Sequence, residues 1–544
     1  MYGTFRGPFV ALVALALVFA SATQADSGQG LRSSPGRDSP AEPTRAHALE
    51  VLARAKGQLS KNTERLRSHR RVGRGPATDI TMTLRDLALA RSALTGPSRR
   101  VADALLSRPP DPGGDELGRP GPAVVYPLRG RRSWCPPNGV ACVHWVTAGA
   151  ERVNLTDSDA DTLPDYVETV YATVAQVWSY QTGTMGYRKP LPDGGTPADA
   201  ANPSDRIDIY LADLGGRDLY GYCVPEGSSR ARQLPGYCVL DNDYSQKQYR
   251  IAPIDALRAT AAHEFFHAIQ FGYDVAEDIW FMEGTATWIE DEVYDSINDN
   301  VQYLPTSAIR FPRRPADLSV ESHRYGSFLL FKYASERLGR TVVRQFWEHS
   351  DASRGRYSLQ AIRSVLAARG TSWPAFFAVF ASWNGLPALS YTEGGRYPAP
   401  VFTLSRTLTR RATTTGWRTV SLPHLSSSSI RVVPHPRLSP RKNLLVEVDA
   451  PDTARGAAAL VQHRYRSGAV AHSVMALNRS GKGRLLVRFD RRVLASLVVV
   501  TSNTSTAMRD CGRVEDGYGG PVYSCYGRGY YDSGQAFGVR ASVR

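Results

Sequence analysis

The chain of 544 residues is long enough for more than one domain. Its 42% hydrophobic and 22% charged residues are typical of globular proteins, which excludes a disordered or fibrous chain. The net charge of +15 is unevenly distributed: residues 133–400 carry −9, whereas residues 23–132 and 401–544 carry +9 and +14. An acidic centre between basic flanks argues against a nucleic-acid-binding protein.

The first 22 residues have the pattern of a secretory signal peptide. Arg6 precedes an apolar run of 12 residues from Phe9 to Ala20, and the small residues Ala20 and Ala22 suit cleavage after Ala22. The run is too short for a bilayer, which needs about 20 apolar residues. No later segment has the length and apolar character of a membrane span. We therefore expect a secreted, extracellular protein without an integral membrane span.

Segment 23–120 is expected to be a linker followed by a helical leader. Residues 23–46 are rich in Ser, Pro, Gly and Arg. Apolar residues then recur at spacings of three and four over 47–70 and 80–106, which predicts amphipathic helices. A basic leader before an acidic body is the layout of a prosegment that covers an acidic cleft. An ordinary helical subdomain explains the pattern equally well.

The body of the chain, residues 121–397, has the pattern of an α+β domain. Alternation over 143–146 and 206–211 predicts strands. Helical periodicity follows over 166–180, 254–271, 279–294, 324–338, 340–349, 358–368 and 374–383. From 398 to 544 short β-rich segments are separated by Gly, Ser, Asn and Pro, which predicts an all-β sandwich.

Six cysteines suit an extracellular chain. Sequence alone does not choose among their pairings, and some could be free buried thiols. Nearest-neighbour disulfides are favoured because each local pair closes a short loop rich in Gly, Pro or Tyr. The three local pairs are Cys135 with Cys142, Cys223 with Cys238, and Cys511 with Cys525.

The strongest chemical signal is the run from His263 to His267, which reads H-E-x-x-H. On a helix, two histidines four positions apart share one face, so both imidazoles can reach one metal ion. Glu264 between them can meet a water activated by the metal. The alternative is a pair of helix histidines held by hydrogen bonds in the core.

A third zinc ligand is predicted at Glu283. Catalytic zinc sites use three protein ligands and an open position. Glu283 follows His267 on a second predicted helix, after a gap with Gly272 that is long enough for a turn. The alternative is a surface glutamate. Glu290 and Asp291 could orient a ligand histidine, but solvated helix charges are the favoured interpretation of both.

The H-E-x-x-H run followed by W-x-x-E-G-x-A-x-W-x-E resembles the gluzincin metallopeptidases. The run from Thr260 to Gln270, with Tyr325-Gly326 further on, is similar to a family of bacterial secreted metalloproteases of myxobacterial and actinobacterial type. The resemblance covers roughly residues 120–395 and implies a zincin-like domain, with His263, His267 and Glu283 on zinc and Glu264 as general base.

The chain also departs from the gluzincin pattern at two points. Thermolysin-type relatives carry Asp four residues after the ligand glutamate, where this chain has Thr287. The aminopeptidase motif G-x-M-E-N is absent, which weakens an aminopeptidase assignment. An endopeptidase is therefore the expected type.

Two further residues are candidates for stabilising the oxyanion that forms on the substrate. This charge needs a donor besides the metal. Tyr325 is the first candidate and His323 the second. A tyrosine buried at a helix start for structural reasons is at least as common as a catalytic one.

A calcium loop is predicted at the start of the helix over 166–180. Oxygen donors stand at positions 1, 3, 5, 7, 9 and 12 of a 12-residue loop, the spacing of an EF-hand. Thr162 occupies the position where an EF-hand has Gly. The alternative is a polar loop that caps the helix. The six predicted ligands are Asp157, Asp159, Asp161, Leu163 through its carbonyl, Asp165 and Glu168.

The sequence therefore predicts a secreted zinc-dependent metallopeptidase that acts on a protein or peptide and carries structural calcium. One alternative is a non-catalytic surface-binding protein with a degenerate zincin core; the intact Glu264 argues against it. Another is a zinc hydrolase of a non-peptide amide, which would share every motif. The basic residues 401–544 suit contact with acidic cell-wall polymers or polysaccharide, and a passive stabilising module is equally consistent.

Overall fold

The computed structural model describes residues 43–68, 80–110, 124–193, 206–228, 230–320, 322–506, 508–509, 530–531 and 534–544. Ser39–Arg544 form one compact unit. The predicted signal peptide and the pair Cys511 and Cys525 lie outside the described residues. None of the helices in these ranges is long and apolar enough to cross a membrane.

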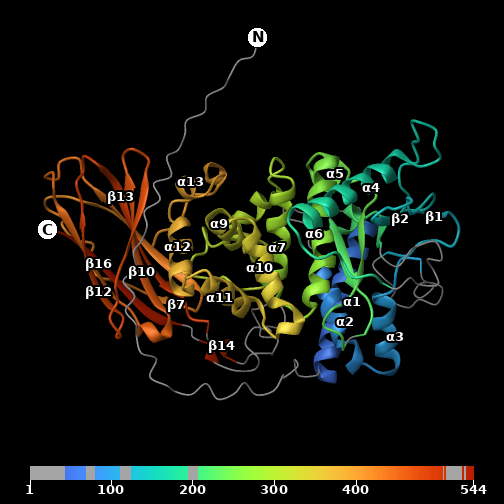
Figure 1. Cartoon of the computed structure of the whole chain (residues 1–544), viewed down its shortest axis with the longest axis horizontal. Helices are drawn as coiled ribbons and strands as arrows, with labels where there is room; N and C mark the ends of the chain where they lie inside the picture. The colour runs from blue at the N-terminus through green and yellow to red at the C-terminus, as the bar shows by residue number, and fades with distance from the viewer. Residues whose placement is uncertain are drawn as a thin grey trace, which may run out of the picture. The chain divides into compact units, whose positions relative to one another are not determined.

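The first part of the chain contains a mixed sheet, of which β1 and β2 are labelled in Figure 1. It has five strands in the order β1-β2-β3-β5-β4. β2, β3 and β5 are parallel, and β1 and β4 pair antiparallel at the two edges. Parallel strands are buried on both faces, which explains why every residue of β2 and β3 is buried. The strands are β1 (Arg131–Trp134), β2 (Ala141–Val146), β3 (Ile207–Ala212), β4 (Gly221–Pro225) and β5 (Gly236–Asp241).

One face of this sheet packs against α4 (Asp165–Trp178) and α6 (Pro253–Asp274). Val174 of α4 and Phe265 of α6 belong to the same apolar cluster as Ile209 of β3. The helix predicted to carry the two histidines is therefore α6, at the centre of the largest core.

The opposite face packs against the helical leader, α1 (Arg45–Ser68), α2 (Thr81–Ala90) and α3 (Gly96–Leu105). Leu84 and Leu87 of α2 share an apolar cluster with Tyr210 and Tyr222 of the sheet. Helices in the leader are thus confirmed. The prediction that α2 is amphipathic is wrong, because nine of its ten residues are buried.

A second group of helices follows α6. α7 (Ile279–Val293) packs against α6 on one side and against α9 (Phe328–Leu338) on the other. Each helix predicted in this part of the body is present, within a few residues of its expected bounds. The remaining helices of the body are α5 (Gln246–Tyr249), α8 (His323–Gly326), α10 (Thr341–Ser350), α11 (Ser358–Ala368), α12 (Trp373–Trp383) and α13 (Pro387–Ser390).

The last part of the chain consists of strands, as expected. One sheet has the order β11-β10-β13-β8-β6 and another the order β12-β9-β16-β7, and both contribute to one apolar cluster. The strands are β6 (Leu404–Leu408), β7 (Arg418–Leu422), β8 (Ser426–Pro434), β9 (Asn443–Asp449), β10 (Ala457–Tyr465), β11 (Val470–Val474), β12 (Lys482–Arg488), β13 (Leu494–Asn503), β14 (Met508–Arg509), β15 (Tyr530–Tyr531) and β16 (Gln535–Val543).

These C-terminal strands contact the helices through buried polar groups as well as apolar ones. Trp373 Nε1 of α12 donates to Thr504 O at 3.0 Å. The His424 ring nitrogen lies 3.0 Å from both carboxylate oxygens of Asp317, and both side chains are buried. The two parts therefore share an interface that resembles a core.

Two of the three expected disulfides lie in the described residues and are confirmed: Cys135–Cys142 and Cys223–Cys238. The second joins β4 to β5 at directly opposed positions. Its Cys223 Sγ lies 3.0 Å from the backbone oxygen of Glu264 on α6. This disulfide therefore sits beneath the helix that carries H-E-x-x-H.

Candidate metal centre

The centre is built on α6, whose sequence favours a helix from its first turn. Pro253 stands at the helix start, where its missing N–H costs nothing, and Asp255 places a negative charge near the positive end of the dipole. His263 and His267 follow one turn apart, both buried, with ring centroids 4.8 Å apart. The helix thus presents two imidazoles to one point.

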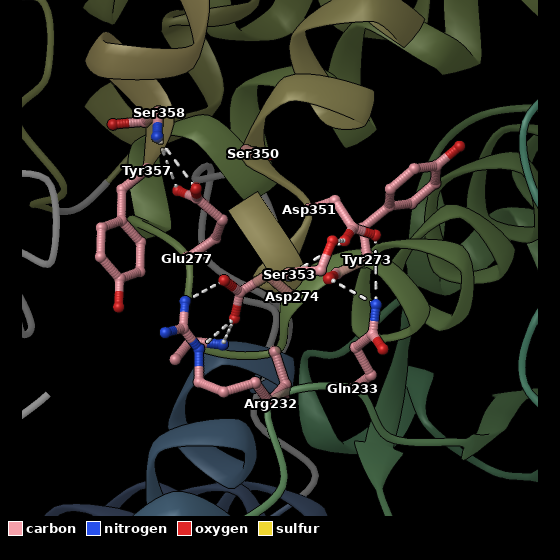
Figure 2. Close-up of polar contacts among 12 residues, drawn as sticks. Arg232, Gln233, Tyr273, Asp274, Glu277, Ser350, Asp351, Ser353, Tyr357 and Ser358 are labelled. Carbon is pink, nitrogen blue, oxygen red and sulfur yellow. Dashed lines mark hydrogen bonds and ion pairs between the residues drawn. The ribbon is translucent and has the colours of Figure 1, made fainter. Parts of the chain in front are cut away.

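The loop between α6 and α7 is fixed by buried polar contacts (Figure 2). The Arg232 guanidinium pairs with the Asp274 carboxylate through two nitrogens. Glu277 accepts the backbone N–H of Ser358 at 2.9 Å. Asp278 accepts the Ser358 hydroxyl. These contacts set where α7 begins relative to α6.

α7 brings Glu283 to the two histidines. Glu283 Oε2 lies 3.4 Å from His263 Nε2 and 3.7 Å from His267 Nε2. One ligand atom from each of the three residues lies within 4.8 Å of the others. A tetrahedral zinc ion with N and O ligands at about 2.0–2.2 Å requires ligand separations of about 3.3–3.6 Å. The spacing therefore fits zinc.

Two members of the donor set, His263 and Glu283, have buried polar atoms without a hydrogen bond among the described residues. His263 Nε2 and both Glu283 oxygens are buried and make no hydrogen bond to the described residues. Burial alone would raise the pKa of Glu283, but the two imidazoles and the nearby Arg324 guanidinium lower it. Glu283 is therefore a carboxylate that lacks hydrogen-bond donors, as a metal ligand should be.

Each histidine is oriented through its other ring nitrogen. His263 Nδ1 lies 2.6 Å from Glu290 Oε1, and burial raises the pKa of Glu290 to about 8 although the contact with His263 lowers it. His267 Nδ1 lies 2.7 Å from Gln270 Oε1. Gln270 Nε2 donates to Met282 O at 2.9 Å, which fixes the orientation of the amide. In both histidines Nδ1 is engaged by a neighbouring side chain, so Nε2 is the ring nitrogen that each can offer to a metal ion.

The favoured interpretation of Glu290 and Asp291 as solvated charges is wrong. Glu290 is buried and contacts His263, which matches the alternative that it orients a ligand. Asp291 is also buried, but it pairs with the Lys332 ammonium at 2.6 Å. Gln270 was not predicted at all. Its position three residues after His267 on the same helix was the available signal.

A cavity that is partly open to solvent lies beside His263. Glu264 lines it and is itself buried, as expected of a general base that meets a water there. Gly221 of β4 permits this approach, because a Cβ there would lie 2.8 Å from Glu264 Cγ. The cavity is lined by Tyr220, Ile251, Ala256, Ala259, Thr260, His263, Glu264, Glu290, Asp299, Tyr303 and Tyr325.

The two candidates for oxyanion stabilisation occupy different places. Tyr325 lines the cavity, with its ring centroid 6.2 Å from that of His263 and stacked on Tyr303. His323 is buried away from the cavity lining. Its ring nitrogens lie 2.7 Å from Thr306 O and 3.1 Å from Pro315 O. The structure thus gives His323 contacts typical of a packing residue and leaves Tyr325 as the candidate donor.

The predicted calcium ligands are brought together only in part. Asp157, Asp159 and Asp161 each place an oxygen within 4.8 Å of the others, at an exposed site. Thr162 has a φ of +82°, the left-handed conformation for which an EF-hand uses Gly. The loop therefore has the expected turn despite the substitution.

The other three predicted calcium ligands have different surroundings. Asp165 accepts hydrogen bonds from Ser158 N and Oγ, at 2.8 and 2.6 Å. The backbone N–H of Leu163 donates to Asp161 Oδ1 at 2.8 Å. Glu168 lies in the first turn of α4, and burial together with the charges of Asp161 and Asp159 raises its pKa.

A third acidic group contains its own cation. Asp291, Asp295 and Glu393 place oxygens within 4.8 Å of one another. The Lys332 ammonium lies 2.6 Å from Asp291 Oδ2 and 3.7 Å from Glu393 Oε2. Because the Lys332 ammonium already pairs with two of these three carboxylates, we describe the group as an ion-pair network.

Comparison with known proteins adds no assignment to this geometry. The sequence matches no protein-family model and no curated protein.

Proposed function

We propose that the protein is a zinc-dependent metallopeptidase, an endopeptidase of the gluzincin type. One observation carries this proposal: two imidazole nitrogens and one buried carboxylate converge within 4.8 Å, beside a cavity lined by Glu264. His263, His267 and Glu283 would hold the zinc ion. Bound there, zinc would supply Lewis-acid polarisation of the substrate carbonyl and of the attacking water.

The protein's own groups would manage the protons and the charge. Glu264 accepts a proton from the attacking water and later passes it to the leaving amine. The Tyr325 hydroxyl donates a hydrogen bond to the substrate oxyanion. Glu290 and Gln270 hold the two imidazoles in place throughout.

The remaining parts of the proposal concern organisation. Residues 121–397 would form a zincin-like catalytic domain and residues 398–544 a β-sandwich. Two disulfides support an extracellular location, with a signal peptide cleaved after Ala22. Calcium would bind the Asp157–Glu168 loop as a structural ion.

The C-terminal strands would serve as an accessory module. Residues 401–544 carry a net charge of +14, which suits acidic cell-wall polymers or polysaccharide. The buried contact of His424 with Asp317 supports an additional stabilising role. Retention of a residue 398–544 fragment on isolated cell wall at low salt, and its release at high salt, would support the binding role.

The function is tested by measuring zinc content and casein hydrolysis of the secreted protein beside Glu264→Ala. We expect one zinc ion per chain in both proteins, and a loss of at least about 1,000-fold in hydrolysis in the variant. Glu348→Ala is a matched control, because Glu348 is exposed on α10 and pairs only with Arg344 in the described residues.

The alternatives give different results. Zinc in both proteins without hydrolysis in either supports a surface-binding protein or a hydrolase of a non-peptide amide. If the purified protein contains no zinc, the two histidines have a structural role and the proposal is wrong.

A further inference from the structure

We propose that Thr81, on leader helix α2, positions the general base Glu264, and that the leader therefore remains part of the active enzyme. This inference rests on the proposed function. It decides between the two interpretations of the leader that the sequence leaves open, a removable prosegment and an integral subdomain.

Thr81 bridges the general base and the edge of the sheet. Its side chain is fully buried, and its hydroxyl donates to Glu264 Oε2 at 3.2 Å. Thr81 Oγ1 also accepts the backbone N–H of Cys223 in β4 at 2.9 Å. The Glu264 carboxylate is thereby tied to a rigid strand through one side chain of the leader. A carboxylate held in this way keeps the orientation that proton transfer requires.

The same helix also holds the loop between the two ligand helices. Arg85 is fully buried and donates to Val275 O at 3.0 Å and to Glu277 O at 2.8 Å. Its charge is paired with Asp86 at 2.9 Å. These loop carbonyls need donors, because a buried carbonyl without one destabilises the fold. α2 thus fixes both the base and the spacing between His267 and Glu283.

Removal of the leader would leave the sheet exposed. Tyr210 and Tyr222 on its second face pack against Leu84 and Leu87. At the end of the leader, Arg108 Nη1 donates to Asp208 Oδ2 of β3 at 2.5 Å, and the Asp208 side chain is fully buried. Without Arg108, this carboxylate would lose its buried guanidinium partner, which is strongly unfavourable. A prosegment that must dissociate would not be expected to supply such contacts.

The side from which Thr81 contacts Glu264 also indicates that the leader positions this carboxylate and does not block the site. All residues that line the cavity beside Glu264 come from the range 220–325, so within the described residues the leader does not enter it. Thr81 reaches the carboxylate from the side of β4 instead. An inhibitory helix would fill the space in which the substrate reacts.

The inference is tested with the full secreted chain carrying Thr81→Val or Thr81→Ser. Valine keeps the volume and removes the hydroxyl, and serine restores it. We expect Thr81→Val to lower kcat about ten-fold or more with KM within about two-fold of wild type. Zinc content should stay at one per chain, and Thr81→Ser should recover at least half of the wild-type kcat. Thr83→Val is the matched control, a buried threonine of the same helix.

Intact mass of the active species gives a readout independent of rate. We expect hydrolytic activity to copurify with a chain that retains residues 81–108. Activity in a species that lacks them overturns the inference, and so does a Thr81→Val variant as active as wild type. A more active variant would identify α2 as an inhibitory element. Should Thr81→Val not be secreted, Thr81→Ala takes its place with the same expected loss.

Failure of the inference is distinguishable from failure of the proposed function. If wild type binds zinc and hydrolyses casein while Thr81→Val does the same, only the inference is wrong. If wild type hydrolyses nothing, the proposed function is wrong, and the inference is overturned with it.

Discussion

At the scale of single residues, the candidate centre depends on groups outside its three proposed ligands. Gln270 is the clearest case, because both the oxygen and the nitrogen of its amide make polar contacts. Its oxygen faces His267 Nδ1, and its nitrogen donates to Met282 O and to Thr285 Oγ1 at 3.0 Å. One side chain thus links a ligand on α6 to the helix that carries Glu283.

Gln270→Leu is therefore expected to weaken zinc binding. Leucine has a similar size but leaves His267 free to rotate and the Met282 carbonyl without its donor. We expect the zinc dissociation constant, measured by competition with a chromophoric chelator, to rise about 10–100-fold. Gln345→Leu, at an exposed glutamine that accepts from Arg369, should bind zinc as wild type does. Equal affinity in all three proteins would contradict the role of Gln270.

Asp299, on the cavity wall, gives a prediction for the pH dependence of stability. Burial raises its pKa from 3.8 to about 6, although a hydrogen bond from Gln302 and the charge of His263 lower it. A carboxyl group whose pKa is higher in the folded state stabilises the fold below about pH 4. It loses that contribution as the pH rises through about 6.

Asp299→Asn should consequently stabilise the zinc-free protein at pH 7.5 but not at pH 4. We expect an increase of about 1–3 kcal/mol in the free energy of unfolding at the higher pH. Denaturant titrations of both proteins at the two pH values measure the difference. A difference that is the same at both pH values would show that the carboxyl charge is not responsible.

At the scale of elements, the loop from Asp157 to Glu168 gives the next prediction. Three carboxylates close together repel one another unless a cation binds, so calcium should stabilise the start of α4. A chelator that removes calcium but spares zinc should lower the melting temperature by about 3–8 °C. Asp161→Asn should abolish this response, whereas Asp103→Asn, on the surface of α3, should retain it. A chelator without effect on wild type would exclude the site.

Helices were easier to predict than strands, for a physical reason. Helices such as α10 and α11 bury one side, so their apolar residues recur with the helical period. α6 and α7 are buried on nearly all sides. β4 and β5 were missed because both faces of the sheet are covered, and no alternation marks the two strands. Their cysteines were interpreted as closing a loop, whereas the disulfide joins paired strands.

The candidate site was predictable only where ligands lie close in sequence. His263 and His267 share one helix, and Glu283 follows on the next. Thr81 gave no signal, because 183 residues separate it from Glu264. Arg85 lies in a segment that was predicted only as an amphipathic helix. Its burial depends on carbonyl groups of a distant loop, which no local pattern reveals.

At the scale of the whole molecule, the three segments that differ in net charge also differ in how they are packed. The segment 133–400, which has a net negative charge, contains the candidate centre. The two basic flanking segments differ from each other in structure. The leader packs its helices on the central sheet, whereas the last strands form their own core and contact α12. Similar net charge in the two flanks therefore does not indicate a similar role.

The position of the leader has a consequence for the order in which the chain folds. The leader is made first, yet its partners in the sheet and at Val275 are made more than 100 residues later. Until those partners are made, the apolar side chains of α2 are exposed to solvent. Contacts so distant in sequence slow folding and expose surface prone to aggregation. A chain exported from its N-terminus would therefore complete its catalytic core only after most of it had crossed the membrane.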